Sequence, residues 1–313
     1  MRFALDDAAQ ALRDAAAEVL RAGLPPDQTW DKLASAGVTG ALVGEADGGL
    51  GLDENALVPL LDDIGYSGLP VPAVETIAVA APLLSRSLGP PDVVTALLDG
   101  GDLVPFGQSA QLFVLRDGNS LRLYRRGELR LRACDSIDTS RLVARLVERP
   151  EAGTGVLLCD DPAEAERAWQ RGVLGTAAVL AGLARRMLDL TVTYVRGREQ
   201  FGVPVGSFQA VKHALADALV AVEFARPLAL AAGWAQAAGA TDAGLLTSAA
   251  KVRATDAARR VARTALQCHG AMGYTTEYDL HRFAKRVWAL APAWGDQAHH
   301  RARIAEGIGA VNG

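Results

Sequence analysis

Residues 198–210 read Arg-Glu-Gln-Phe-Gly-Val-Pro-Val-Gly-Ser-Phe-Gln-Ala, and this glycine-containing stretch separates two long helical patterns. Ala, Leu and Val dominate the patterns on either side. Four long helices are expected, at about 163–197, 205–238, 241–269 and 277–309. Asp161 and Pro162 suit the cap and the first position of the first helix. Long helices with short connections pack as antiparallel bundles, so the sequence predicts a C-terminal four-helix bundle over residues 161–313.

The region ahead of the bundle changes from a helical period toward a period of two. Leu112–Leu115 and Leu121–Tyr124 flank the turn sequence Asp117-Gly118-Asn119, which is typical of a β-hairpin. Further strands are expected at 128–132, 142–147 and 156–158. The sequence therefore predicts a small β domain over residues 103–160.

Residues 1–102 have a helical pattern. Apolar residues recur at three- and four-residue spacing from Leu5 to Leu20, and a second helix is expected from an Asp27 cap through Leu33. Additional helices are expected at Asn55–Gly65 and Thr76–Leu84. The predicted fold class is therefore mostly α with a small β domain, in the order helical domain, sheet, four-helix bundle.

The composition excludes several classes of protein. Of the 313 residues, 50% are hydrophobic and 22% are charged, which excludes a disordered chain. The net charge of −4 gives no indication of nucleic-acid binding. The longest run of small apolar residues, Gly172–Ala184, is shorter than the roughly 20 residues that cross a bilayer. Three widely spaced cysteines form neither a disulfide framework nor a metal motif, so we expect a cytoplasmic protein that binds no membrane.

Two loops carry residues that suit a phosphate. Arg198 lies at a helix end beside glycine-containing turns, where a guanidinium can bond two phosphate oxygens. The alternative is an ordinary loop with a surface arginine. In the second loop, Gly270 and Gly273 follow a long helix that carries Gln267 and His269, and their backbone N–H groups could contact a phosphate or ribose. The alternative there is a glycine C-cap.

A third cluster contains Asp296, His299, His300 and Arg301. Asp296 and His299 lie on one helical face, so acid–base chemistry or metal ligation is conceivable. With no third ligand within reach in the sequence, we expect no metal site. The alternative is a solvated helix start capped by Asp296. Cys268 lies in an apolar helix without an activating base and is expected to be a core residue.

These motifs together resemble the flavoprotein acyl-CoA dehydrogenase family. The resemblance rests on Arg198–Gly202, Phe208-Gln209, Gln267–Tyr274 with Glu277, Gly37–Gly40, Glu45–Gly51 and Asp63–Gly65. It covers nearly the whole chain, and the order of domains agrees with the family: helical domain, β-barrel, four-helix bundle. The resemblance therefore implies the acyl-CoA dehydrogenase architecture with a reduced β-barrel.

In that family two subunits share each FAD, and the resemblance implies that this chain contributes contacts to the ADP half of a shared FAD. The positions that carry over are Arg198, Phe201, Gln209, Gln267, Gly270, Ala271 and Gly273. Ala271 replaces a glycine of the family pattern, a mild change unless that residue needs a positive φ.

The departures from the family pattern concern the flavin cradle and the catalytic base. No cradle-like segment is found near Leu103–Ser109, and the β domain is about half the usual length. Counting without gaps, the two positions at which family members carry a catalytic glutamate are Trp294 and Gly172. Neither is a carboxylate, so no catalytic residue is expected in this chain.

This combination resembles the smaller, non-catalytic subunit of heteromeric α2β2 acyl-CoA dehydrogenases of actinobacteria, which act in steroid side-chain β-oxidation. The resemblance implies an FAD-dependent oxidoreductase of lipid metabolism that introduces an α,β double bond into an acyl-CoA, with a bulky steroid side-chain CoA as the expected substrate. A homologous catalytic subunit would complete the heterotetramer and supply the flavin cradle and the carboxylate.

Two other hypotheses stay open on the sequence. The chain could be a homomeric acyl-CoA dehydrogenase with a displaced base, either Asp296, with His299 behind it, or Glu166. It could also be a flavin-free scaffold subunit that only stabilises a partner.

Overall fold

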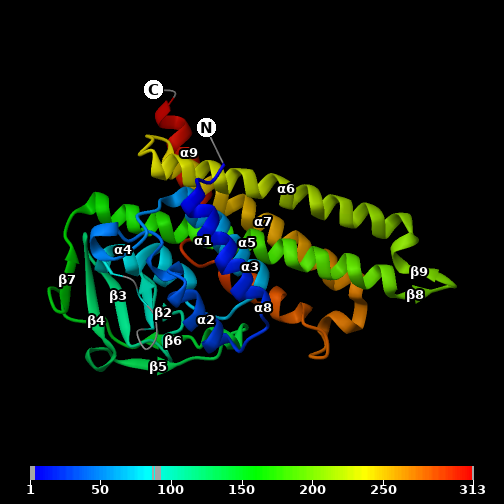
Figure 1. Cartoon of the computed structure of the whole chain (residues 1–313), viewed down its shortest axis with the longest axis horizontal. Helices are drawn as coiled ribbons and strands as arrows, with labels where there is room; N and C mark the ends of the chain where they lie inside the picture. The colour runs from blue at the N-terminus through cyan, green and yellow to red at the C-terminus, as the bar shows by residue number, and fades with distance from the viewer. Residues whose placement is uncertain (1–3, 87, 89–92, 312–313) are drawn as a thin grey trace.

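The computed structural model describes residues 4–86, 88 and 93–311. Three groups of elements follow one another along the chain: short helices, two small sheets and long helices (Figure 1). The predicted fold class is therefore confirmed. The boundaries 1–102, 103–160 and 161–313 stay a prediction. None of the described helices is long and apolar enough to cross a membrane.

The N-terminal part is helical up to Leu84. Its elements are α1 (Asp7–Arg21), α2 (Pro26–Ser35), α3 (Glu54–Ser67), the π-helix η3 (Val74–Ala80) and α4 (Ala81–Leu84). The prediction of Asp27 as a cap is wrong, because α2 begins one residue earlier at Pro26 and places Asp27 in its first turn. The helix expected over 76–84 begins as a π-helix and becomes α-helical only at Ala81.

The strands between the N-terminal helices and α5 (Pro162–Gly197) form two small sheets. The first contains β1 (Val94–Leu97), β3 (Leu112–Asp117), β4 (Ser120–Arg125) and β7 (Val156–Cys159), in the order β1-β3-β4-β7. The second contains β2 (Leu103–Val104), β6 (Ala144–Leu146) and β5 (Leu131–Ala133), in the order β2-β6-β5. The predicted hairpin is confirmed, because β3 and β4 pair antiparallel from Leu112↔Arg125 to Asp117↔Ser120.

Strand β1 lies in the region for which the sequence predicted helix. All four of its residues are buried, and it pairs parallel with β3. A strand that is covered on both faces has no alternation of polar and apolar residues, so its apolar run cannot be distinguished from a buried helix. The expectation of helix up to residue 102 is therefore wrong from Val94 onward.

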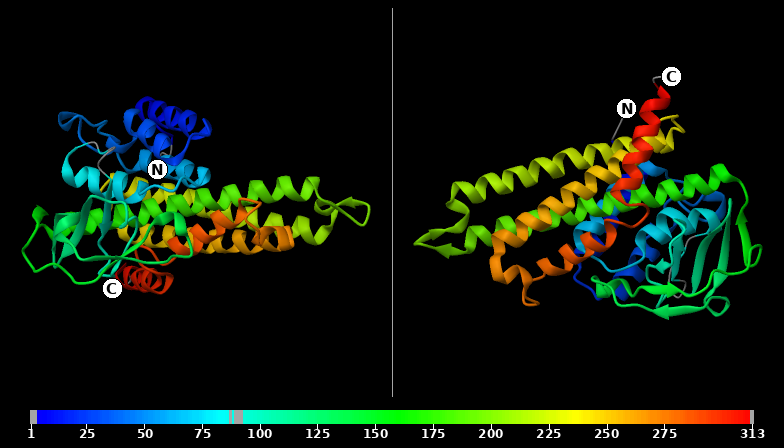
Figure 2. Two further views of the ribbon diagram at one scale, coloured as in Figure 1. Left: turned by 90° about the horizontal axis from the view of Figure 1, so that it is seen from below. Right: turned by 180° about the vertical axis from the view of Figure 1, so that it is seen from behind.

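The described C-terminal part is built mainly of five α-helices (Figure 2). They are α5 (Pro162–Gly197), α6 (Gln209–Ala237), α7 (Ala243–His269), α8 (Leu280–Leu290) and α9 (Gln297–Val311). The Asp161 side chain caps α5 by accepting a hydrogen bond from Ala163 N at 2.9 Å, as predicted. The single helix expected over 277–309 is wrong, because Pro292 and the positive φ of Trp294 (+60°) and Gly295 (+93°) separate α8 from α9.

Helices α3 and α5 cross with their backbones in close contact. A methyl group at Gly65 would overlap the carbonyl of Val179, and one at Gly182 would overlap the carbonyl oxygen of Asp62. One hydrophobic core therefore extends from the N-terminal helices into the bundle. This crossing fixes the position of the N-terminal helices against α5.

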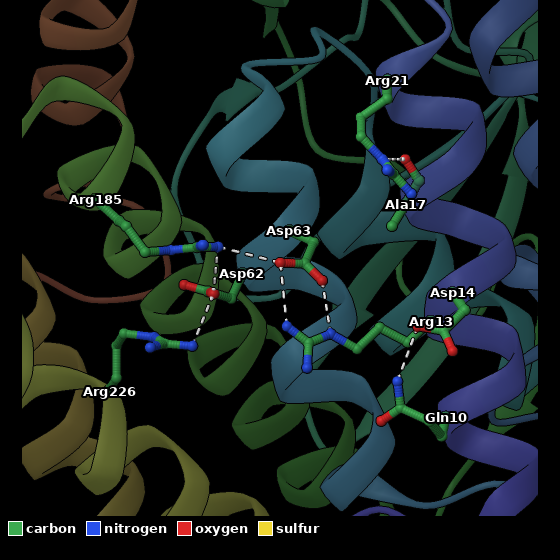
Figure 3. Close-up of polar contacts among 9 residues, drawn as sticks. All are labelled: Gln10, Arg13, Asp14, Ala17, Arg21, Asp62, Asp63, Arg185 and Arg226. Atoms are coloured by element: carbon green, nitrogen blue, oxygen red, sulfur yellow. Dashed lines mark hydrogen bonds and ion pairs between the residues drawn. The ribbon is translucent and has the colours of Figure 1, made fainter. Parts of the chain in front are cut away.

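A network of charged side chains reinforces this crossing (Figure 3). Arg13 of α1 donates to Asp63 of α3 at 2.7 and 3.3 Å. Arg185 of α5 donates to Asp62 at 2.8 Å and to Asp63 at 3.1 Å, and Arg226 of α6 lies 3.5 Å from Asp62. Burial raises the pKa of Asp62, and the two arginines beside it oppose that rise. Four helices thus meet at one pair of carboxylates.

The close crossing generates a prediction about Gly182. Gly182→Ala places a methyl group against backbone atoms that cannot rotate away, so it should lower the free energy of unfolding by about 1–3 kcal/mol. Gly197→Ala, at the open end of the same helix, meets no atom within 4 Å and is the matched control. Denaturant unfolding measures both variants. Equal stability of the two variants would contradict the close backbone packing.

Candidate functional site

Two loops lie at one end of the bundle. The short hairpin of β8 (Glu199–Gln200) and β9 (Val203–Pro204) joins α5 to α6, and the 3-10 turn η7 (Gly270–Tyr274) follows α7 (Figure 1). Tyr194 stacks on His269 with ring centroids 4.2 Å apart, and Tyr278 contacts the same imidazole at 4.8 Å. The structure thus brings the two predicted phosphate loops to the same end of the molecule.

The predicted contacts on the first loop all lie at the surface. The Phe201 ring is 92% exposed, and its backbone has a φ of +55°, which is strained for a residue with a side chain. Arg198 and Gln209 are also exposed. Among the described residues, no carboxylate oxygen lies within 4.0 Å of the Arg198 guanidinium. These side chains are open to a ligand or to another chain.

The second loop depends on a glycine conformation. Gly270 ends α7 with φ +58° and ψ −135°, a region that only glycine occupies readily, although a side chain there would meet nothing within 4 Å. It also serves as the C-cap position. Ala271 follows in the 3-10 turn without a positive φ, so the alanine is tolerated. Gln267 and Ala271 are exposed, whereas Gly273 is buried against Leu266 and His269.

The exposed residues have the chemistry that the ADP half of an FAD would need. The guanidinium of Arg198 is available for phosphate oxygens, and Gly270, which has no side chain, lets a ligand approach the backbone. The exposed ring of Phe201 would become buried only on contact with a ligand or with another chain. These residues therefore form an exposed surface at this end of the bundle.

Trp294 and Gly172, which are far apart in sequence, contact each other directly. A Cβ atom at Gly172 of α5 would lie 2.7 Å from Cδ2 of the Trp294 indole and would overlap Cε3 and Cζ3. The indole is only 5% exposed. The ring therefore covers the backbone at position 172, and only glycine fits beneath it.

Two buried polar side chains hold the turn that carries Trp294. The Lys251 ammonium donates to the carbonyls of Ala291 at 3.0 Å and Gly295 at 3.1 Å. His300 Nε2 donates to the carbonyl of Trp294 at 2.9 Å. Burial lowers the pKa of Lys251 to about 7. Burial, with the nearby charge of Lys251, lowers the pKa of His300 to about 4, so the imidazole is neutral at pH 7.

A cavity of about 410 Å³ lies beside Trp294, between the strands and the turn after α8. The buried Arg141 lines it and donates to the carbonyl of Ala289 at 3.3 Å. Burial raises the pKa of Glu75, partly offset by Arg141, and lowers that of Arg141, partly offset by Glu75. Asp138 binds Arg286 next to this pair, and Arg286 lowers the pKa of that carboxyl despite its burial.

Sequence reasoning missed these buried charges. Glu75 is an isolated charge in an apolar run, and that is a signal that could have indicated it, whereas Lys251 has Thr247, Ser248 and Arg253 around it and carries no such signal. Which partner each would meet depends on contacts across the fold.

The two alternative bases are engaged elsewhere. Asp296 caps α9 by accepting a hydrogen bond from His299 N at 2.8 Å, and backbone hydrogen bonds lower its pKa. Glu166 pairs with Arg303 at 2.7 Å and accepts from Gln170 at 3.0 Å. Both carboxylates line an open groove of about 600 Å³ on the outer side of the turn. Cys268 is half-buried, and burial raises the pKa of its thiol.

The contact between Trp294 and Gly172 can be tested by a double-mutant cycle. Trp294→Ala should cost about 3–5 kcal/mol of unfolding free energy by leaving a cavity. Gly172→Ala should cost about 1–3 kcal/mol through overlap with the ring. Because the overlap disappears with the ring, the double variant should be no less stable than Trp294→Ala alone. Additive costs in denaturant unfolding would show that the two residues do not touch.

Comparisons with known proteins agree with this architecture. The family model "Acyl-CoA dehydrogenase, C-terminal domain" matches residues 165–309, the span of α5 to α9. The chain is 29% identical over 292 residues to the acyl-CoA dehydrogenase IpdE2 of Mycobacterium tuberculosis, covering 87% of this chain and 85% of the relative.

Solved structures have the same fold. One is the ChsE4-ChsE5 complex from Mycobacterium tuberculosis, with a TM-score of 0.84, 23% identity and 99% coverage of both chains. Another is a variant of the Tcur3481-Tcur3483 steroid ACAD, with a TM-score of 0.77 and 25% identity, covering 97% of this chain and 96% of that one. The C-terminal part of the chain, residues 165–309, thus matches the C-terminal domain of acyl-CoA dehydrogenases, and the whole chain has the fold of solved acyl-CoA dehydrogenase structures and is similar along most of its length to IpdE2.

Proposed function

We propose that the chain is the non-catalytic subunit of an FAD-dependent acyl-CoA dehydrogenase. In this proposal the complex introduces an α,β double bond into an acyl-CoA, and a homologous partner supplies the flavin cradle and the catalytic carboxylate. The observation that carries the proposal is the contact of Trp294 with Gly172.

Removal of the α-proton of a thioester needs a base held at the reacting carbon. At the two positions where the family resemblance predicts that base, this chain has an indole ring and a hydrogen atom. A carboxylate side chain at position 172 has no room while the Trp294 ring lies on its backbone. Lys251 and His300 hold the turn in place, so Trp294 is part of a fixed structure.

The contribution of this chain is the set of surface contacts at the end of the bundle. Arg198 would bind the pyrophosphate, and Phe201, Gln209 and Gln267, with the backbone from Gly270 to Gly273, would border the adenosine. FAD, when bound, supplies the acceptor for the hydride from the β-carbon. This chain would thus orient the cofactor, and the partner would move the proton.

Several relatives support a heteromeric assembly and a steroid substrate. The structures with this fold include a ChsE4-ChsE5 complex and a Tcur3481-Tcur3483 steroid ACAD. We extend from them to an α2β2 heterotetramer and to a bulky steroid side-chain CoA as substrate. All three cysteines are free, as a reducing compartment requires, and we place the complex in the cytoplasm.

Arg198→Ala tests the role in cofactor binding. The variant loses the charged hydrogen bonds to phosphate, worth about 1.5–3 kcal/mol, so FAD retention by the complex should fall at least about tenfold. Arg196→Ala, an exposed arginine two residues earlier in α5, is the matched control and should retain FAD. The measurement is FAD per complex after gel filtration with the partner subunit. An unchanged ratio of FAD to complex in the Arg198 variant would contradict the assignment of Arg198 to the pyrophosphate.

A further inference from the structure

A groove of about 480 Å³ runs between α6 and α7, which lie side by side along the bundle (Figures 1 and 2). Its α7 side carries four exposed arginines: Arg253, Arg259, Arg260 and Arg263. They lie on one face of a single helix, in a chain whose net charge is −4. The groove therefore concentrates positive charge locally.

The acidic groups around the groove do not neutralise it. Asp256 is taken by Gln297, whose Nε2 donates to it at 2.6 Å, and by Arg301 at 3.7 Å. Arg259 donates to Oε1 of the same Gln297 side chain at 3.0 Å. Asp217 of α6 lines the groove as well. In the part of the chain that the structure describes, no carboxylate oxygen lies within 4.0 Å of the other three guanidinium groups.

Apart from Asp217, the α6 side of the groove is apolar. Val220 lines it, and Phe224 follows one turn later on the same face, with 53% and 65% of their surfaces exposed. Leu219 beside them is 47% exposed. Exposed aromatic and aliphatic side chains next to arginines have the composition of a protein interface. A site for a small anion alone would leave this apolar surface uncovered.

The charge decides which protein fits. In a two-fold contact with a second copy, the same surface faces itself, and arginines would oppose arginines. A partner with carboxylates on its docking helices meets no such repulsion. The α6–α7 face also continues toward the residues proposed to border FAD, because Gln267, which is one of them, lies one turn beyond Arg263 on α7.

We infer that the α6–α7 face docks an acidic helical face of the homologous catalytic subunit, and that its arginines disfavour pairing with a second copy of this chain. The inference rests on the proposed function, since that function supplies the partner. It assigns to Arg253, Arg260 and Arg263 a role in the choice of partner, separate from the role of Arg198 in binding FAD.

The test compares two triple variants of the full chain. The first carries Arg253→Glu, Arg260→Glu and Arg263→Glu, and the second carries lysine at the same three positions. The partner is the acyl-CoA dehydrogenase homologue that co-purifies with the wild-type chain. Affinity is measured by sedimentation velocity at low and high salt. The glutamate variant should bind at least about tenfold more weakly at low salt, whereas the lysine variant should keep its affinity and its salt dependence.

Each other outcome overturns the inference in a distinct way. If the glutamate variant binds the partner with wild-type affinity and retains FAD, the α6–α7 face does not dock the partner. The proposed function is then unaffected. Failure of the wild-type chain to assemble with any FAD-binding homologue would remove both. Saturable binding of inorganic phosphate or CoA to the chain alone, lost in the glutamate variant while assembly is unchanged, would assign the groove to a small anion.

Discussion

The contact between the Trp294 indole and the bare backbone of Gly172 is the constraint on which the functional part of the molecule depends. It joins the turn between α8 and α9 to the long helix α5. Because the ring occupies the space of any side chain at position 172, tryptophan at one position requires glycine at the other. In our proposal these are the two positions of the family's catalytic base, and the pair fills both with packing.

The rest of the structure holds this contact in place. Lys251 and His300 satisfy the carbonyls of a turn that contains two positive φ angles, and both are buried where a charge is disfavoured. Ten residues further along α5, at Gly182, the close crossing with α3 and the carboxylates of Asp62 and Asp63 position the N-terminal helices. Helix α5 is thus fixed at two places along its length.

Much of the fold could be predicted because the long helices have clear breakers and the β3–β4 hairpin has a clear turn. The division of the last helix could not, because the turn that divides it is held by Lys251, which donates to the carbonyl of Gly295, 44 positions later in the sequence. Strand β1 was missed because a strand buried on both faces lacks alternation. The sequence indicated both exposed loops. Their placement at the same end of the bundle depends on contacts across the fold, such as the stacking of Tyr194 on His269. The buried charges around Arg141 left no pattern that names their partners.

In the proposed function this chain borders an FAD without holding one by itself. The most direct measurement is the visible absorption spectrum of the chain purified alone, compared with the chain purified together with its homologous subunit, each normalised to protein concentration. The account predicts no flavin absorbance for the chain alone and stoichiometric flavin in the complex. Stoichiometric flavin in the chain alone would contradict the account.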